Sequence, residues 1–210
     1  MKLSLPVAAS WALLSLSAQA GAPELPSNHL QVPIIRQATN YSCGAASLLS
    51  VLLYWNSFSG REKELGKMLG TTSSDGTEPG SMARVARSFG LKAFVLKNMT
   101  VRDLREALRL GETVILDLQA WKDPDSKLDW SKDWSDGHYV VLVGMDAEFA
   151  YFMDPWYGIN SVYLPLSELT ERWHDVYDRT SHSRRYFGLG IMIDGASSHP
   201  TEPAALIHMD

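Results

Sequence analysis

A polar, turn-forming segment passes directly into an apolar helix in the sequence Gln37-Ala-Thr-Asn-Tyr-Ser-Cys43-Gly-Ala-Ala-Ser-Leu-Leu-Ser-Val-Leu-Leu-Tyr-Trp55. Residues 45–55 are apolar almost all round and contain no Pro or Gly, which predicts a buried helix. Cys43, the only cysteine of the chain, stands where this helix begins. Backbone N–H groups at a helix N-terminus favour negative charge, so we expect the thiolate of Cys43 to be stabilised. The pattern indicates a nucleophile, with an inert core thiol as the alternative.

The first twenty residues have the pattern of a secretory signal peptide. Lys2 supplies a positive start, residues 3–16 are mostly apolar, and residues 18–20 form a small-x-small cleavage signal. We therefore expect an exported protein, periplasmic or secreted, with an uncleaved N-terminal anchor as the alternative. No other run of the sequence is apolar for long enough to cross a bilayer, so we expect no stable membrane span after cleavage. In an oxidising compartment a structural thiol normally has a disulfide partner, which the sequence does not offer Cys43.

Length and charge restrict the function classes. Cleavage would leave about 190 residues, enough for one domain with its own core. We expect a signal peptide over 1–20, an extended lead-in over 21–30, one domain over 31–195 and a flexible tail over 196–210. Without Lys2 the chain carries 18 basic and 24 acidic side chains. This mild acidity argues against nucleic acid as a partner, because phosphate binding needs clustered Lys and Arg.

Hydrophobic periodicity places helices in the first half and strands in the second. We expect helices over 45–55, 62–69, 80–89, 100–110 and 167–173, and strands over 91–96, 113–118, 138–143, 149–153, 161–164 and 186–193. The helix at residue 100 begins with a Thr100–Asp103 capping box and stops at Gly111. Helices followed by a strand-rich half predict an α+β fold with segregated layers.

Two apolar runs, 138–143 and 149–153, flank a short loop that contains Gly144 and Asp146. This is the pattern of a β-hairpin. A turn centred on Asp146 would place His138 directly opposite Asp154, because each is eight residues from the centre. Directly paired residues point to the same face of a sheet. We therefore expect an imidazole–carboxylate pair, which fixes a histidine tautomer for base catalysis. A turn displaced by one residue would point the two side chains apart.

Gln37 lies six residues before Cys43, and the later segments read Gly137-His138-Tyr139-Val140-Val141 and Asp154-Pro155. In this order and spacing, these motifs resemble the peptidase C39 family. Its members are papain-like cysteine peptidases best known for removing leader peptides from bacteriocins and similar exported peptides. The resemblance extends over roughly residues 32–193.

The resemblance implies a papain-like fold, with the nucleophile helix packed on a C-terminal antiparallel sheet. It implies Cys43 as nucleophile, His138 as general base and acid, Asp154 as the residue that orients His138, and Gln37 as oxyanion donor. The implied substrate is an exported peptide or protein precursor, and an association with an export system fits this context. The implied chemistry needs no cofactor, and the scattered histidines of the sequence show no metal-ligand spacing.

Each assignment has a plainer alternative. His138 can begin a strand with a solvated ring, Asp154 before Pro155 can be an ordinary turn residue, and Gln37 can be an exposed loop residue. Two other functions also stay open. A cell-wall amidase or a peptidyl transferase would use the same triad, and a non-catalytic domain could bind an exported peptide.

A long connection over residues 119–137 delivers the chain to His138 and contains Trp121, Trp130 and Trp134. An insertion of this length within a compact domain is more often functional than idle. We expect these tryptophans to help shape the substrate groove.

Overall fold

The computed structural model describes residues 23–121, 129–159, 161–179 and 182–196, so the expected signal peptide and nearly all of the expected tail lie outside the described residues. The helices are α1 (Cys43–Tyr54), α2 (Glu62–Leu69), α3 (Pro79–Ser88), α4 (Val101–Leu110) and α5 (Leu166–Arg172), with a short 3-10 helix, η1 (Trp130–Lys132). The strands are β1 (Lys92–Leu96), β2 (Thr113–Gln119), β3 (Gly137–Met145), β4 (Phe149–Met153), β5 (Ser161–Pro165), β6 (His174–Arg179), β7 (His182–Phe187) and β8 (Gly190–Asp194). Every expected helix is present within two residues of its expected bounds.

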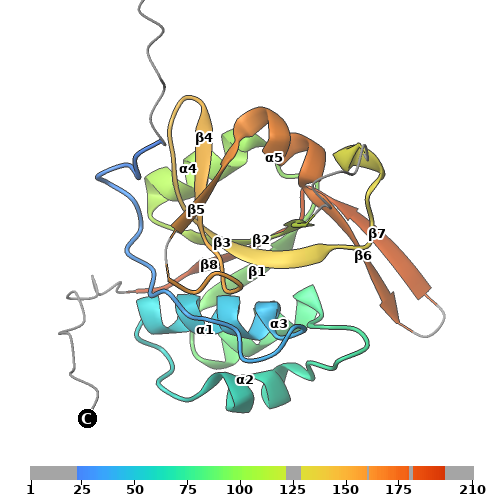
Figure 1. Ribbon diagram of the computed structural model, residues 1–210. Coiled ribbons are helices and arrows are strands. Elements are labelled where there is room, and N and C mark those ends of the chain that lie inside the picture. Colours follow the sequence, from blue (N-terminus) through green and yellow to red (C-terminus); the bar gives the residue numbers. More distant parts are fainter. Residues whose placement is uncertain (1–22, 122–128, 160, 180–181, 197–210) are drawn as a thin grey trace, which may run out of the picture.

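A six-stranded antiparallel sheet of order β1-β8-β2-β3-β4-β5 lies between two groups of helices. Helices α1, α2 and α3 gather on one face, and α4 and α5 cover the other (Figure 1). Alternate side chains of β3 point to opposite faces of the sheet and pack into two different hydrophobic cores. Tyr139 and Val141 belong to the core under α1, whereas Val140 and Leu142 belong to the core under α4 and α5. The expected α+β architecture, with the Cys43 helix packed on an antiparallel sheet, is confirmed.

Helix α1 is buried on nearly all sides, as its sequence predicts. Its two internal serines are fully buried, and both are satisfied by hydrogen bonds. Ser47 Oγ donates to the carbonyl of Tyr139 at 3.1 Å, and Ser50 Oγ donates to the carbonyl of Pro33. The first of these bonds ties α1 to β3, because Tyr139 is a residue of that strand. The start of α1 is thereby fixed against the strand that carries His138.

Helix α4 begins and ends as expected. The Asp103 carboxylate accepts the Thr100 N–H at 2.7 Å, and Thr100 Oγ1 accepts the Asp103 N–H at 3.3 Å. Gly111 follows the helix with a φ of 76°, a conformation that glycine adopts without strain. This helix leads directly into β2, which is buried along its whole length.

The C-terminal strands differ from the expectation. The single strand expected over 186–193 is wrong: residues up to Phe187 belong to β7, and β8 begins at Gly190. Gly188 separates them with a φ of 55°, and its Cα lies so close to Met99 that a Cβ would be 2.6 Å from the Met99 carbonyl oxygen. Strand β7 pairs with β6 in a separate two-stranded ribbon that extends from one side of the molecule (Figure 1).

The N-terminal lead-in is described from residue 23, and residues 23–42 contain turns but neither helix nor strand. The Leu30 N–H donates to the carbonyl of Val143 at 2.7 Å, so this segment lies against β3. The proposed boundaries at residues 20, 30 and 195 stay predictions. Within the described ranges, no helix combines the length and the apolar character that a membrane crossing needs.

Candidate active site

Cys43 is the first residue of α1 and is partly buried. A compact turn precedes it: Thr39 N–H donates to Ser42 Oγ at 3.0 Å, and Ser42 Oγ lies 3.1 Å from the Thr39 carbonyl, to which it donates. The Ser42 carbonyl then accepts the Ala46 N–H at 3.0 Å, which is the first bond of the helix. This turn fixes the path from Gln37 to Cys43 and leaves the sulfur at the N-terminal end of the helix.

The hairpin that carries His138 and Asp154 has a different register from the one expected. Near the turn, Met145 pairs with Ala150 and Gly144 with Tyr151, so the turn is centred between residues 147 and 148 rather than on residue 146. This register alone would place Asp154 opposite residue 141 and would send its side chain to the face away from His138.

A bulge at Val143 corrects the displacement. Beyond it Leu142 pairs with Phe152 and residue 141 with residue 153, so one residue of β3 has no counterpart in β4. Extension of the corrected register places Asp154 opposite residue 140, two residues from His138 on the same face. The expected direct pairing is therefore wrong, and the two residues are diagonal neighbours. Their shared face was expected for an incorrect reason: the turn shifts the partner of Asp154 by three residues and the bulge shifts it back by one. The net shift of two residues keeps both side chains on the same face.

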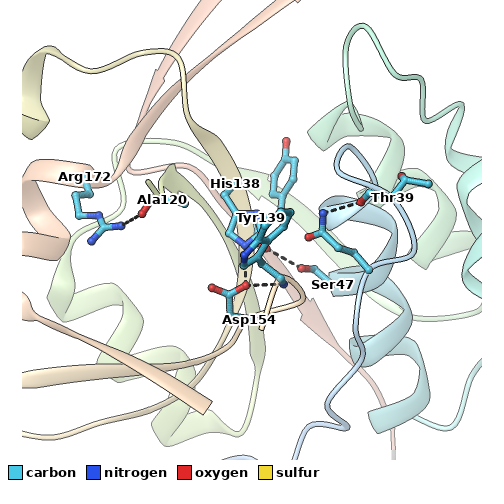
Figure 2. Close-up of polar contacts among 9 residues, drawn as sticks. Thr39, Ser47, Ala120, His138, Tyr139, Asp154 and Arg172 are labelled. Atoms are coloured by element: carbon cyan, nitrogen blue, oxygen red, sulfur yellow. Dashed lines mark hydrogen bonds and ion pairs between the residues drawn. The ribbon is translucent and has the colours of Figure 1, made fainter. Parts of the chain in front are cut away.

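The His138 ring and the Asp154 carboxylate are hydrogen-bonded. His138 Nε2 lies 2.8 Å from Asp154 Oδ1, and Figure 2 shows the two side chains joined in this way. The same oxygen accepts the Trp156 N–H at 2.8 Å, and the Asp154 carbonyl accepts the Gly158 N–H at 3.1 Å. His138 is 1% exposed and Asp154 is 7% exposed. The carboxylate is thus held by its own turn while it orients a buried imidazole.

The other ring nitrogen of His138, Nδ1, is buried and makes no hydrogen bond within the described part of the chain. Burial acts to lower the pKa of His138, but the hydrogen bond to Asp154 and the interaction with the Cys43 thiol outweigh it and raise that pKa to about 9. The imidazolium form is therefore favoured at neutral pH. A nearby imidazolium stabilises a thiolate, so this arrangement suits an ion pair between the ring and the sulfur.

Gln37 is buried rather than exposed, with 9% of its surface accessible. Its backbone N–H donates to the carbonyl of Pro155 at 2.8 Å, which joins the loop before α1 to the residue after Asp154. Its side-chain Nε2 donates to the Thr39 carbonyl at 2.7 Å. An amide nitrogen carries two hydrogens, so one remains for another acceptor. The loop that leads to the sulfur and the loop after β4 are thereby tied together at Gln37.

The three tryptophans of the long connection lie in different surroundings. Trp121 packs against the site: its ring centroid is 4.7 Å from that of His138 and 5.3 Å from that of Trp156, and neither pair of rings is parallel. Trp134 lines a cavity that also includes Cys43. Trp130 packs against Arg172, whose guanidinium carbon is 4.1 Å from the ring centroid. Two of the three therefore flank the site, and the role expected for all of them stays a prediction.

Sequence reasoning missed two carboxyl groups close to Cys43. Asp117 on β2 and Asp175 on β6 both line the cavity next to the thiol, together with Tyr139. A single acidic residue inside the apolar run 113–118 was a usable signal for Asp117. Asp175 offered no such signal, because its strand was not expected. Among the described residues, no group of three or more His, Cys, Asp or Glu side chains is placed to hold a metal ion.

Comparisons with known proteins show the family and the fold of this chain. A family model described as "Peptidase_C39 like family" matches residues 29–182. A double glycine motif protease from an AMS/PCAT transporter, solved with its leader peptide, is 22% identical with a TM-score of 0.53, covering 80% of this chain and 94% of that one. A C39-like peptidase from Bacillus anthracis is 19% identical with a TM-score of 0.59, covering 81% and 98%.

The peptidase domain of Streptococcus ComA, a bifunctional ABC transporter involved in quorum sensing, is 16% identical with a TM-score of 0.58 and covers 79% of this chain and 99% of its own. No curated protein matches the sequence. The structural likenesses show a shared papain-like peptidase fold, and the family model spans most of the described domain. The chain belongs to the C39-like peptidase family.

Proposed function

We propose that this protein is a cysteine endopeptidase in which Cys43, His138 and Asp154 act as nucleophile, general base and orienting carboxylate. The observation that carries the proposal is the state of the His138 ring. Nε2 is hydrogen-bonded to Asp154 Oδ1 at 2.8 Å. Nδ1 is buried and makes no hydrogen bond within the described residues. The Cys43 thiol helps to raise the pKa of this ring. A ring fixed through one nitrogen, with the other open, suits proton exchange with a thiol.

The reaction would proceed by acyl transfer. The Cys43 thiolate attacks the carbonyl carbon of a peptide bond, and the His138 imidazolium gives its Nδ1 proton to the departing amine. A thioester to Cys43 and a neutral imidazole result. His138 then takes a proton from water, and the hydroxide adds to the thioester carbonyl. The C–S bond breaks, the carboxylic acid product leaves and loses its proton to solvent, and the thiolate–imidazolium pair is restored.

The developing oxyanion would be stabilised by two donors at the start of α1. The Cys43 backbone N–H points along the axis of a helix N-terminus, and the second Nε2 hydrogen of Gln37 is the other candidate. Because Thr39 already holds one hydrogen of this amide, the group is oriented before substrate binds. Loss of one such donor typically costs about 3–4 kcal/mol of barrier height.

We propose an exported peptide or protein precursor as the substrate, with leader-type cleavage as the reaction. Support comes from the family, from the signal-like pattern of residues 1–20, and from the solved relative described as a double glycine motif protease in complex with the leader peptide. Export to the periplasm or beyond, and an association with an export system, are parts of the same proposal.

The decisive experiment incubates candidate exported precursors with wild type, Cys43→Ala and Gln37→Ala and measures product masses. We expect cleavage by wild type, none by Cys43→Ala, and a rate reduced about 10²- to 10³-fold by Gln37→Ala. An amine-coupled product instead of two peptides would indicate a transferase. Iodoacetamide labelling of Cys43 at pH 6, where an ordinary thiol is almost entirely protonated, separates an enzyme from a binding domain. A labelling rate equal to that of free cysteine, unchanged in His138→Ala, would contradict the catalytic assignment.

A further inference from the structure

A cavity of about 220 Å³ opens beside Cys43 and is lined by acidic side chains. The charged side chains that line it are Asp75, Asp117 and Asp175, and none of its described lining residues is Lys or Arg. Aromatic rings of Trp134 and Tyr177 also contribute to its walls. Sites for drug-sized ligands measure about 300–1,000 Å³, so this cavity is suited to a single side chain rather than to a whole small molecule.

The carboxyl of Asp117 is the most unusual group of this cavity. Asp117 is 2% exposed, and its Oδ1 has no hydrogen-bond partner among the described residues. Burial raises the pKa of Asp117 well above its ordinary value, and the charge of neighbouring Asp175 raises that pKa further. Burying a carboxyl oxygen without a hydrogen-bond donor costs free energy. A ligand N–H group that donates to Asp117 would remove this cost.

Asp175 is held next to Asp117 by the fold. Gln119 Nε2 donates to Asp175 Oδ1 at 2.9 Å, and burial raises the pKa of Asp175 as well. Its approach depends on the residue before His138: a Cβ at Gly137 would lie 2.2 Å from Asp175 Oδ2. Glycine at 137 therefore lets a carboxylate reach the first residue of β3, next to the proposed base. Burial opposes the ionisation of both carboxyls, and a cation bound between them would favour it.

We propose that this cavity is the subsite for a positively charged side chain, Lys or Arg, that flanks the scissile bond of the substrate. The inference rests on the proposed peptidase function and names the chemistry of its substrate. The cavity includes the nucleophile itself, so a side chain seated there belongs to a residue next to the cleaved bond. Asp117 and Asp175 would accept hydrogen bonds from the ammonium or guanidinium group, and the Tyr177 ring offers an aromatic wall. The Trp134 ring already carries a cation of the protein, because the Arg185 guanidinium carbon lies 4.6 Å from its centroid.

The first test needs no substrate. Cys43 is modified with three methanethiosulfonates that transfer a cationic aminoethyl, a neutral methyl or an anionic sulfonatoethyl group. In each reaction the thiolate attacks the sulfenyl sulfur, a mixed disulfide forms and methanesulfinate leaves. Normalised to a free cysteine peptide, the cationic reagent should react roughly tenfold faster than the neutral one, and the anionic reagent more slowly. Asp117→Asn and Asp175→Asn should reduce this preference, whereas Glu171→Gln, which removes an exposed charge on α5, should not.

The second test profiles cleavage of a proteome-derived peptide library, with N-termini acetylated in one sample and free in another. We expect Lys and Arg to be enriched on one side of the cleaved bonds, and we expect this enrichment to be lost from the residual cleavage by Asp117→Asn. Cleavage without that enrichment overturns the subsite and leaves the peptidase intact. Absence of cleavage by wild type, with the reagent preference retained, overturns the peptidase instead. Cleavage only of non-acetylated peptides would assign the cavity to an N-terminal amine and overturn the side-chain proposal.

Thermal unfolding of each variant guards against loss of the fold, and the Asn side chain of Asp117→Asn is nearly isosteric with the Asp side chain that it replaces. Millimolar Ca²⁺ is added to wild type and to Asp117→Asn in the same assay. A rise in Tm with Ca²⁺ in wild type alone would make the cavity a metal site and overturn the proposal. No change in either protein agrees with a subsite for an organic cation.

Discussion

His138 and Asp154 are diagonal rather than direct neighbours on β3 and β4, yet Nε2 and Oδ1 of these residues are 2.8 Å apart. The carboxylate lies just beyond the end of β4, where the Trp156 N–H also binds it. It therefore approaches the ring from the strand end and leaves Nδ1 on the other side. The bond determines both the orientation of the ring and the nitrogen that is available for proton transfer.

Replacement of Asp154 by Asn should lower kcat/KM by about 10²- to 10⁴-fold, because the amide can hold the wrong tautomer and does not stabilise the imidazolium. The fold should survive, since the Asn Oδ1 can still accept the Trp156 N–H. Steady-state kinetics with a cleaved precursor provides the measurement. The control is Asp194→Asn, which makes the same change at an exposed ion pair with Lys92; equal losses in the two variants would contradict the orienting role.

Stability should depend on pH through His138. Its pKa is about 9 in the folded protein against 6.5 for an unperturbed histidine. Because the folded value is the higher one, the contribution is fully present below about pH 6.5 and is lost as pH rises through 9. The difference corresponds to roughly 3 kcal/mol. Urea unfolding from about pH 6 to about pH 10 should show this decline in wild type. Its persistence in His138→Gln would assign it to other groups.

The contact of α1 with its surroundings leaves no space for a side chain at Gly44. A Cβ there would lie 2.7 Å from Thr77 Cβ and 3.1 Å from the Tyr139 ring. Gly44→Ala should therefore displace the first turn of α1, destabilise the protein by about 1–3 kcal/mol and lower activity. Gly66→Ala in α2 is the matched control, because its Cβ meets atoms only at 3.9 Å and beyond. That variant should be neutral or up to about 1 kcal/mol more stable.

The Trp121 ring covers His138, and its removal should admit water to the imidazole. Trp121→Ala should lower kcat/KM by about tenfold, because a hydrated bond between His138 and Asp154 orients the ring less well. Burial acts to lower the pKa of His138, so the alkaline limb of the pH–rate profile should move upward when the cover is lost. Trp130→Ala, which removes a ring packed against Arg172, should leave both quantities unchanged and reduce only stability.

The helical half of the fold was predictable because its signals are local. The capping box at Thr100, the stop at Gly111 and the all-apolar face of α1 each act within one or two turns of chain. The β6–β7 ribbon was not, since it is rich in charged residues and extends beyond the sheet. Its partner choice depends on the break at Gly188, which is set by contact with Met99 rather than by neighbouring sequence.

The candidate site was predictable in its members but not in its geometry. Cys43 could be placed from the helix that follows it, and His138 and Asp154 from the hairpin pattern. The sequence contains no signal for the bulge, because Val143 lies in an unbroken apolar run and resembles its neighbours. The acidic cavity was not predicted from the sequence either. It combines Asp117 and Asp175 from strands that are distant in the sequence, and only the folded chain brings them to the thiol.

The unpaired Val143 has a consequence for how this hairpin can change over time. A single residue gained or lost in the 146–149 turn would carry Asp154 to the wrong side of the molecule unless β3 lost or gained one too. Length variation here should therefore occur only in compensated pairs. A single inserted residue would separate Asp154 from His138 although the gene still encodes both.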